Sequence, residues 1–213
     1  MVISTPLKIP DWMFLLQIYF LAVLVIPVTA NKEPIELAWI EAREKFYQCI
    51  EDGKEISAAI RLFKQISQTN GKYEGICQTY QGVLIALKGK HAFWPHQKFM
   101  LVKRGLSTMD AGLKKAPNDL ETLFIHSSTC YYLPFFFGRA DNARRGFKKV
   151  ITLLPNQYTN YDKNLITNVI GFLLSHIHLT DKELRVLEDI KVSLTAQWNM
   201  VSIMADGFNN CCH

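Results

Sequence analysis

The side chains best suited to nucleophilic or metal chemistry in this 213-residue sequence are six histidines and five cysteines. His126 and Cys130 lie four residues apart, which on a helix places both on one face at the spacing of a metal-ligand pair. Two ligands do not make a zinc site, and no third or fourth follows at a defined spacing. His176 and His178 are two residues apart and would point to nearly opposite sides of a helix. We therefore expect neither a metal site nor a bound cofactor.

A cysteine nucleophile needs a thiolate and a nearby base, so the catalytic hypothesis is an enzyme that uses His126 and Cys130, or a pair of histidines at 91 and 96. No catalytic signature surrounds Cys130. The sequence also lacks a Gly-x-Ser-x-Gly elbow, a Gly-rich phosphate loop and a His-Glu-x-x-His motif. A protein without catalytic activity is favoured. The thiol state stays open for Cys49, Cys77, Cys130, Cys211 and Cys212.

Two aromatic segments interrupt otherwise regular helical patterns and supply the candidate binding residues. Residues 133–139 hold three consecutive phenylalanines between a proline and a glycine, and residues 91–96 hold Phe93 and Trp94 between two imidazoles. The ordinary explanations are a cap on the core for the first segment and a polar-tipped loop for the second. If the helices form a groove, we expect both segments at its rim. The candidate ligand- or partner-binding residues are His91, Phe93, Trp94, His96, Phe135, Phe136, Phe137 and Arg139.

A basic cluster follows the phenylalanine-rich segment at residues 133–139. Its members are spaced four apart on a predicted helix, opposite the apolar side, and a solvated helix face is the ordinary explanation. The alternative is peripheral contact with anionic lipid headgroups or an acidic partner. These residues are Arg144, Arg145, Lys148 and Lys149. The net charge of +5 is well short of a nucleic-acid arm, so we expect no nucleic-acid partner.

The first thirty residues have the order of a secretory signal peptide. Lys8 supplies positive charge, residues 12–28 are almost wholly apolar, and small residues lead to Ala30 before a polar stretch. We expect cleavage after Ala30 and export to the periplasm or the extracellular space. The alternative to cleavage is an uncleaved membrane anchor through residues 12–28. This apolar segment lies at the low end of the length range for a membrane span.

The remainder of the chain is predicted to be helical, with a domain over residues 31–205 and a flexible tail over 206–213. A composition of 49% hydrophobic and 20% charged residues excludes disordered, collagen-like and disulfide-scaffold classes. Apolar residues recur at helical spacing, without a long strict alternation. Seven or eight helices are expected, over about residues 34–51, 56–69, 73–89, 95–115, 119–133, 141–154, 161–179 and 181–198. Short connections make neighbouring helices antiparallel, which predicts an all-α fold of helical hairpins.

Two of these helices begin with the signature of a capping box. Asn118 precedes Glu121 by three residues, and Thr180 precedes Glu183 by three. In a capping box the first side chain accepts a hydrogen bond from the backbone of the fourth residue, whose carboxylate reaches back to the first residue's N–H. Both starts are predicted to be capped in this way.

Two helical segments resemble each other. Residues 105–118 and 143–156 each combine a small residue, a bulky apolar residue four positions later, and a closing Pro-Asn at Pro117 and Pro155. The pattern resembles the tetratricopeptide (TPR) superfamily, whose repeat of about 34 residues closes its second helix with proline. The prolines here are 38 residues apart, because residues 133–138 add length. A generic helical bundle is the alternative.

The resemblance implies a right-handed, TPR-like array of hairpins with a concave surface that binds proteins or peptides. The leading hypothesis is therefore an exported, non-catalytic helical-repeat protein that binds a partner protein or peptide. The alternative is a carrier of a small apolar ligand in an aromatic-lined groove. An enzyme that depends on cysteine and histidine is the third hypothesis.

Overall fold

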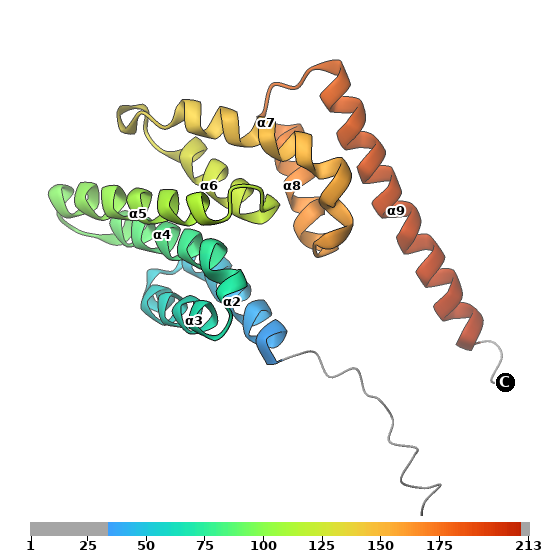
Figure 1. The fold of residues 1–213 in the computed structure, drawn as a ribbon, viewed down its shortest axis with the longest axis horizontal. Helices are drawn as coiled ribbons and strands as arrows, with labels where there is room; N and C mark the ends of the chain where they lie inside the picture. The colour runs from blue at the N-terminus through green and yellow to red at the C-terminus, as the bar shows by residue number, and fades with distance from the viewer. Residues whose placement is uncertain (1–33, 210–213) are drawn as a thin grey trace, which may run out of the picture. The chain divides into compact units, whose positions relative to one another are not determined.

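The computed structural model describes residues 34–209, and every regular element within them is helical (Figure 1). The predicted signal segment, the anchor alternative and two of the cysteines, Cys211 and Cys212, lie outside the described residues. The α-helices are α2 (Pro34–Glu51), α3 (Ile56–Thr69), α4 (Glu74–His91), α5 (Pro95–Lys115), α6 (Leu120–Tyr132), α7 (Ala140–Gln157), α8 (Lys163–His176) and α9 (Asp181–Asn209). Short 3₁₀ turns follow some of them: η1 (Gly53–Glu55), η2 (Gly71–Tyr73), η3 (Phe135–Phe137) and η4 (Tyr158–Asn160).

Eight packed helices, with adjacent helices antiparallel, confirm the predicted all-α fold for the described part of the chain. From Ala38 onward the helices form one unit, and the packing described below lies within it. In the α4–α5 hairpin, the start of α4 lies against the end of α5, since Gly75 faces Ala116. Gly89, near the end of α4, faces Lys98 near the start of α5.

The predicted helix starts are partly confirmed. Pro95 occupies the first turn of α5, as its fixed φ angle favours. Thr180 and Glu183 form the predicted capping box, with the Thr180 N–H donating to Glu183 Oε2 at 2.8 Å and the Glu183 N–H donating to Thr180 Oγ1 at 3.3 Å. These bonds satisfy two N–H groups that the helix geometry leaves without partners.

The capping box predicted for α6 is wrong. Asp119, not Asn118, caps this helix, and its Oδ1 accepts a hydrogen bond from the Thr122 N–H at 2.7 Å. Glu121 is free of the cap and points into the core, where an arginine meets it. Further along, Pro155 lies inside α7, so this helix runs three residues beyond its predicted end. A proline so near a helix end removes only one hydrogen bond from the last turn.

The core has two aromatic centres. In the first, Tyr80 stacks on Phe63 with ring centroids 4.6 Å apart and meets the edge of Phe46 at 4.7 Å. In the second, Phe172 of α8 contacts Phe147 of α7 with ring centroids 5.4 Å apart. Helix α8, which lies within the helix predicted over residues 161–179, buries Leu165, Ile166, Val169, Ile170 and Leu173. None of the described helices is long and apolar enough to span a bilayer.

Candidate functional site

A groove of about 940 Å³ runs between helices that are far apart in the sequence. Its walls come from α2, α4, α5, α6, the η3 segment and one residue of α8. The lining residues are Phe46, Tyr47, Ile50, Val83, Ala86, Leu87, Gly89, Lys90, Pro95, Lys98, Phe99, Val102, Phe124, Ile125, Ser128, Thr129, Tyr132, Leu133, Pro134, Phe136, Phe137 and Phe172. Most are aliphatic or aromatic, as in pockets that bind apolar ligands.

The two aromatic segments singled out in the sequence border this groove together. Pro95 is the first residue of α5, directly after the α4–α5 connection, while Pro134 and Phe137 come from the segment between α6 and α7. Phe99 of α5 stacks on Phe137 of η3 with ring centroids 5.6 Å apart, and this contact joins the two hairpins at the groove edge. One end of the groove is thus built from both hairpin ends.

Hydrogen-bonding groups on the groove wall are largely used within the chain. Ser128 Oγ and Thr129 Oγ1 both donate to the Ile125 carbonyl, at 3.2 and 2.8 Å, and Lys90 Nζ donates to the Ile50 carbonyl at 3.0 Å. None of the lining residues in the described part of the chain is acidic. The wall therefore offers apolar area and a basic side chain, Lys98, but no paired carboxylates for acid–base chemistry.

The candidate binding residues are distributed around the groove. Phe136 and Phe137 line it. Phe93, Trp94 and Phe135 are exposed at the hairpin ends and stand outside the lining. The histidines His91 and His96 are exposed, and neither lines the groove. Arg139 does not line the groove, and its Nη2 lies 2.8 Å from Asp110 Oδ2.

Several groove residues carried no distinguishing signal in the sequence. Val83, Val102 and Thr129 have the same helical spacing as residues of the core. Which apolar side chains face a gap depends on how the helices pack, and periodicity along one helix does not contain that information. Only the clustered aromatics and prolines marked the groove edge in advance.

The cysteine–histidine pair forms a second, largely buried cluster with an aspartate. His126 Nε2 lies 2.8 Å from Asp110 Oδ1, and Cys130 Sγ lies 3.8 Å from His126 Nδ1. Burial opposes ionisation of Asp110, but hydrogen bonds from Arg139 and His126 outweigh it and lower the pKa of that carboxyl. A cavity of about 400 Å³ reaches Asp110 and His126 but not Cys130.

The thiol of this cluster is poorly suited to attack a substrate. Burial raises the pKa of Cys130 to about 12, so the thiolate that would be the nucleophile is scarce at neutral pH. Cys49, Cys77 and Cys130 are all free thiols and all buried. Among the described residues, no group of three or more histidine, cysteine, aspartate or glutamate side chains is placed to hold a metal ion.

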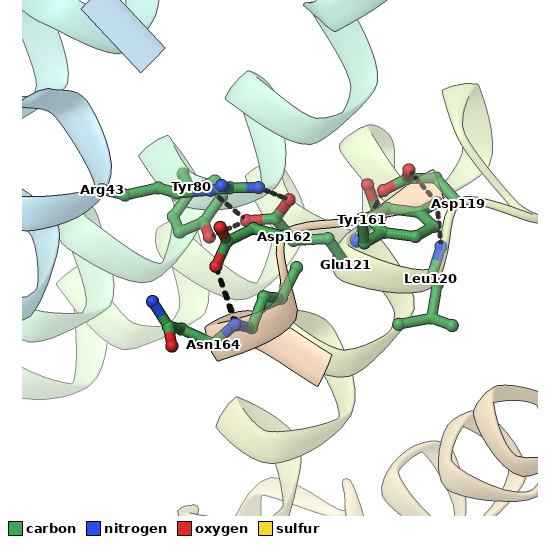
Figure 2. Close-up of polar contacts among 10 residues, drawn as sticks. Arg43, Tyr80, Asp119, Leu120, Glu121, Tyr161, Asp162 and Asn164 are labelled. Carbon is green, nitrogen blue, oxygen red and sulfur yellow. Dashed lines mark hydrogen bonds and ion pairs between the residues drawn. The ribbon is translucent and has the colours of Figure 1, made fainter. Parts of the chain in front are cut away.

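A buried ion pair links the helices that carry the groove (Figure 2). Arg43 of α2 donates through Nε to Glu121 Oε1 at 2.7 Å and through Nη2 to Oε2, and the Tyr80 hydroxyl of α4 donates to Oε1 at 2.6 Å. Burial raises the pKa of Glu121, although Arg43 and Tyr80 oppose the shift. Three helices, α2, α4 and α6, are thereby held together at one carboxylate.

A second polar contact in Figure 2 fixes the start of α6 against the approach to α8. The Tyr161 hydroxyl donates to Asp119 Oδ2 at 2.8 Å and accepts from the Leu120 N–H at 3.0 Å. Asp162 then caps α8 by accepting from the Asn164 N–H at 2.9 Å. These bonds position α6, whose opposite end forms part of the groove.

Comparison of this sequence with models of protein families, with curated proteins and with solved structures finds no match. No relative therefore assigns a ligand to the groove or a family to the hairpins. The groove geometry and the sequence pattern are the basis of the functional proposal.

Proposed function

We propose that this chain is an exported, non-catalytic protein that binds a segment of a partner protein in its apolar groove. The supporting observation is the groove of about 940 Å³, whose aromatic and aliphatic walls carry no acidic side chain among the described residues. Binding there would be driven by removal of apolar surface from water, with few polar groups to fix orientation.

The partner segment that fits such a wall is an amphipathic helix. An extended peptide would bring its backbone N–H and C=O groups against a surface whose hydroxyls at Ser128 and Thr129 are already bonded to Ile125. Unpaired buried backbone groups cost about 1–3 kcal/mol each. A helix satisfies its own backbone and presents a row of apolar side chains, so it avoids this cost.

The proposal includes the TPR-like organisation of the hairpins. The two similar segments are the second helices of successive hairpins, and each uses a small residue against its partner helix. Gly105 of α5 faces Ala86 of α4, and Gly146 of α7 faces Ser127 of α6. The corresponding positions of the two segments, Gly105 and Ala143, are both small and buried, which supports a repeated unit. Export rests on the signal-like order of residues 1–30.

A small apolar ligand is the second candidate for the groove. The observation that favours it is the volume, which lies within the range of about 300–1,000 Å³ that is typical of small-molecule pockets. A carrier would hold its ligand through purification, whereas a partner helix would be lost with the partner protein. Native mass spectrometry of the purified full chain distinguishes the two, because only a carrier shows an added small mass.

The test fills the groove and follows binding. Thr129 lies on the wall, and Thr129→Trp adds an indole to the space that the occupant needs. Thr195→Trp is the matched control, since Thr195 is exposed on α9 and its hydroxyl likewise donates to a carbonyl four residues earlier, at 2.9 Å. Immobilised full chain would be exposed to envelope and extracellular fractions.

The proposal expects a protein that the parent chain and Thr195→Trp both capture and that Thr129→Trp loses. Capture that survives Thr129→Trp unchanged would place the partner elsewhere and contradict the groove. A small mass bound to the parent chain and lost in Thr129→Trp would favour the carrier. If neither a captured protein nor a bound small mass is detected, both candidate functions are contradicted.

A further inference from the structure

Two neighbouring hairpin ends expose large aromatic side chains to solvent. At the α4–α5 end, Phe93 is 83% exposed and Trp94 is 55% exposed, and Met100 follows one turn into α5. At the α6–α7 end, Phe135 is 93% exposed and Phe136 is also exposed. Single exposed apolar residues are ordinary, but adjoining aromatic patches on soluble domains usually mark an interaction site.

The two ends belong to one surface. The Phe99–Phe137 stack connects them directly, and Pro95 and Phe136 line the same groove. Figure 1 shows the α4–α5 connection and the η3 segment at the same end of their hairpins. We call this surface, made of residues 93–100 and 134–137, the aromatic end.

The η3 part of the aromatic end is a preformed turn. The Phe137 N–H donates to the Pro134 carbonyl at 3.0 Å, and the Gly138 N–H donates to the Phe135 carbonyl at 2.9 Å. Gly138 has φ of +66°, a left-handed conformation that glycine adopts without a steric cost, and this turns the chain back into α7. This closed turn fixes the backbone that carries Phe135 and Phe136, both of which are exposed.

The charge around the aromatic end is basic. No acidic residue occurs in residues 75–109 or in residues 122–140. Within the first range Lys98, Lys103 and Arg104 are exposed on α5, and Lys103 Nζ lies 5.3 Å from the Phe99 ring centroid. The acidic side chains nearby are Asp52, which lies near His91, and Asp110 and Asp141, which form ion pairs with Arg139 and Arg144. The aromatic residues thus stand in a positive setting.

We propose that the aromatic end docks on an anionic lipid surface, with Phe93, Trp94, Phe135 and Phe136 inserted among the headgroups. Aromatic side chains favour the interface between headgroups and acyl chains, and flanking lysines attract anionic headgroups. The end of the groove that Pro95, Phe136 and Phe137 line then faces the membrane. This docking goes beyond the proposed partner binding and does not depend on it.

The test measures flotation of the full chain with vesicles of phosphatidylcholine, with or without phosphatidylglycerol. Phe93→Ser/Phe135→Ser removes two exposed rings that do not line the groove, so its fold and groove stay intact. We expect binding to phosphatidylglycerol vesicles to fall about tenfold or more in this variant. Val192→Ser, which changes an exposed apolar residue of α9, should leave binding unchanged. The apolar residues 12–28 are identical in all variants, so the ratio of partition coefficients, measured at lipid concentrations below saturation of binding, isolates the effect of the two rings.

A second measurement localises the contact. Brominated lipid quenches tryptophan fluorescence at short range, and the difference between the parent chain and Trp94→Phe isolates the emission of Trp94. Docking as proposed requires that this difference signal is quenched by brominated phosphatidylglycerol vesicles. An unquenched Trp94, with binding unchanged in Phe93→Ser/Phe135→Ser, would overturn the proposal.

Two other outcomes assign the surface differently. If Arg145→Glu/Lys148→Glu abolishes vesicle binding while the phenylalanine variant binds normally, the basic face of α7 is the lipid contact and the proposal is wrong. If the phenylalanine variant loses a captured protein but keeps vesicle binding, the aromatic end serves a protein partner. Vesicle binding that persists in Thr129→Trp, which blocks the groove, keeps this test separate from that of the proposed function.

Discussion

Gly105 of α5 lies so close to Gly82 of α4 that a Cβ atom built on Gly105 would be 2.5 Å from the Gly82 carbonyl oxygen. The same Cβ would lie 2.6 Å from the Ala86 backbone nitrogen. Backbone atoms cannot move aside as a flexible side chain can. The two helices therefore touch through their main chains, and the glycines of this hairpin set the distance between two walls of the groove.

Gly105→Ala should destabilise the fold by about 1–3 kcal/mol, because the new methyl group must push two helix backbones apart. Gly171→Ala is the matched control: Gly171 is also inside a helix, but nothing lies within 4 Å of its Cβ position. That substitution should stabilise the protein by about 0.5–1 kcal/mol, since alanine favours helix more than glycine does. Urea unfolding measures both. Equal effects at the two sites would contradict the close contact.

Arg43→Met should cost about 3–5 kcal/mol at neutral pH, because it leaves the carboxylate of Glu121 buried without its cation. Lys115→Met is the control, since Lys115 forms an exposed ion pair with Glu74 at 2.7 Å and exposed pairs contribute about 0–1 kcal/mol.

The cost of Arg43→Met should also depend on pH. The pKa of Glu121 is raised above its ordinary value of 4.5 by burial, and loss of Arg43 raises it further. A carboxyl with a raised pKa binds its proton more tightly in the folded chain, so stability falls as pH rises above about 4.5. The cost of Arg43→Met should be smallest in acid and grow toward neutral pH. A constant cost from pH 4 to 7 would show that Glu121 does not titrate in this way.

The sequence predicted those structural features that depend on residues close together in the chain. Pro95 and the helical spacing after it predicted α5 from its first residue to its last. The clustered phenylalanines between Pro134 and Gly138 marked a break in the helices, which the structure shows as η3. Each of these signals involves residues within a few positions of one another.

Contacts between residues that are far apart in the sequence were not predicted. Arg43 and Glu121 are 78 residues apart, and the Asn118–Glu121 spacing suggested a cap instead. The glycines at 82 and 105 meet only when α4 and α5 pack, and the groove exists only where side chains fail to fill the space between helices. Local pattern does not report such gaps.

Cys130 should react slowly with iodoacetamide in the folded chain at pH 7. Its pKa of about 12 leaves little thiolate, and its burial limits access. Peptide mass spectrometry would follow alkylation at this residue, and unfolding in urea should accelerate it by orders of magnitude, to the rate of an exposed cysteine. Rapid alkylation of the folded chain, abolished by His126→Ala, would instead support the cysteine–histidine enzyme.

Gly146 of α7 should resist substitution because of one side chain, Ser127 of α6. A Cβ on Gly146 would overlap Ser127 Oγ and lie 3.0 Å from Ser127 Cβ, whereas the next atom, the Leu123 carbonyl oxygen, is 3.9 Å away. Gly146→Ala should therefore cost about 1–3 kcal/mol. Ser127 Oγ donates to the Leu123 carbonyl at 2.7 Å, so it is not free to turn away.

Removing that oxygen should relieve the clash, which makes the two substitutions non-additive. In the Ser127→Ala background the remaining 3.0 Å contact needs a shift of only a few tenths of an ångström, and Gly146→Ala should cost less by about 1 kcal/mol. A double-mutant cycle by urea unfolding measures the difference. Gly105→Ala offers the contrast, because its clash is with backbone and no side-chain truncation relieves it. Additive effects at Gly146 and Ser127 would mean that α6 and α7 do not approach as closely as this contact requires.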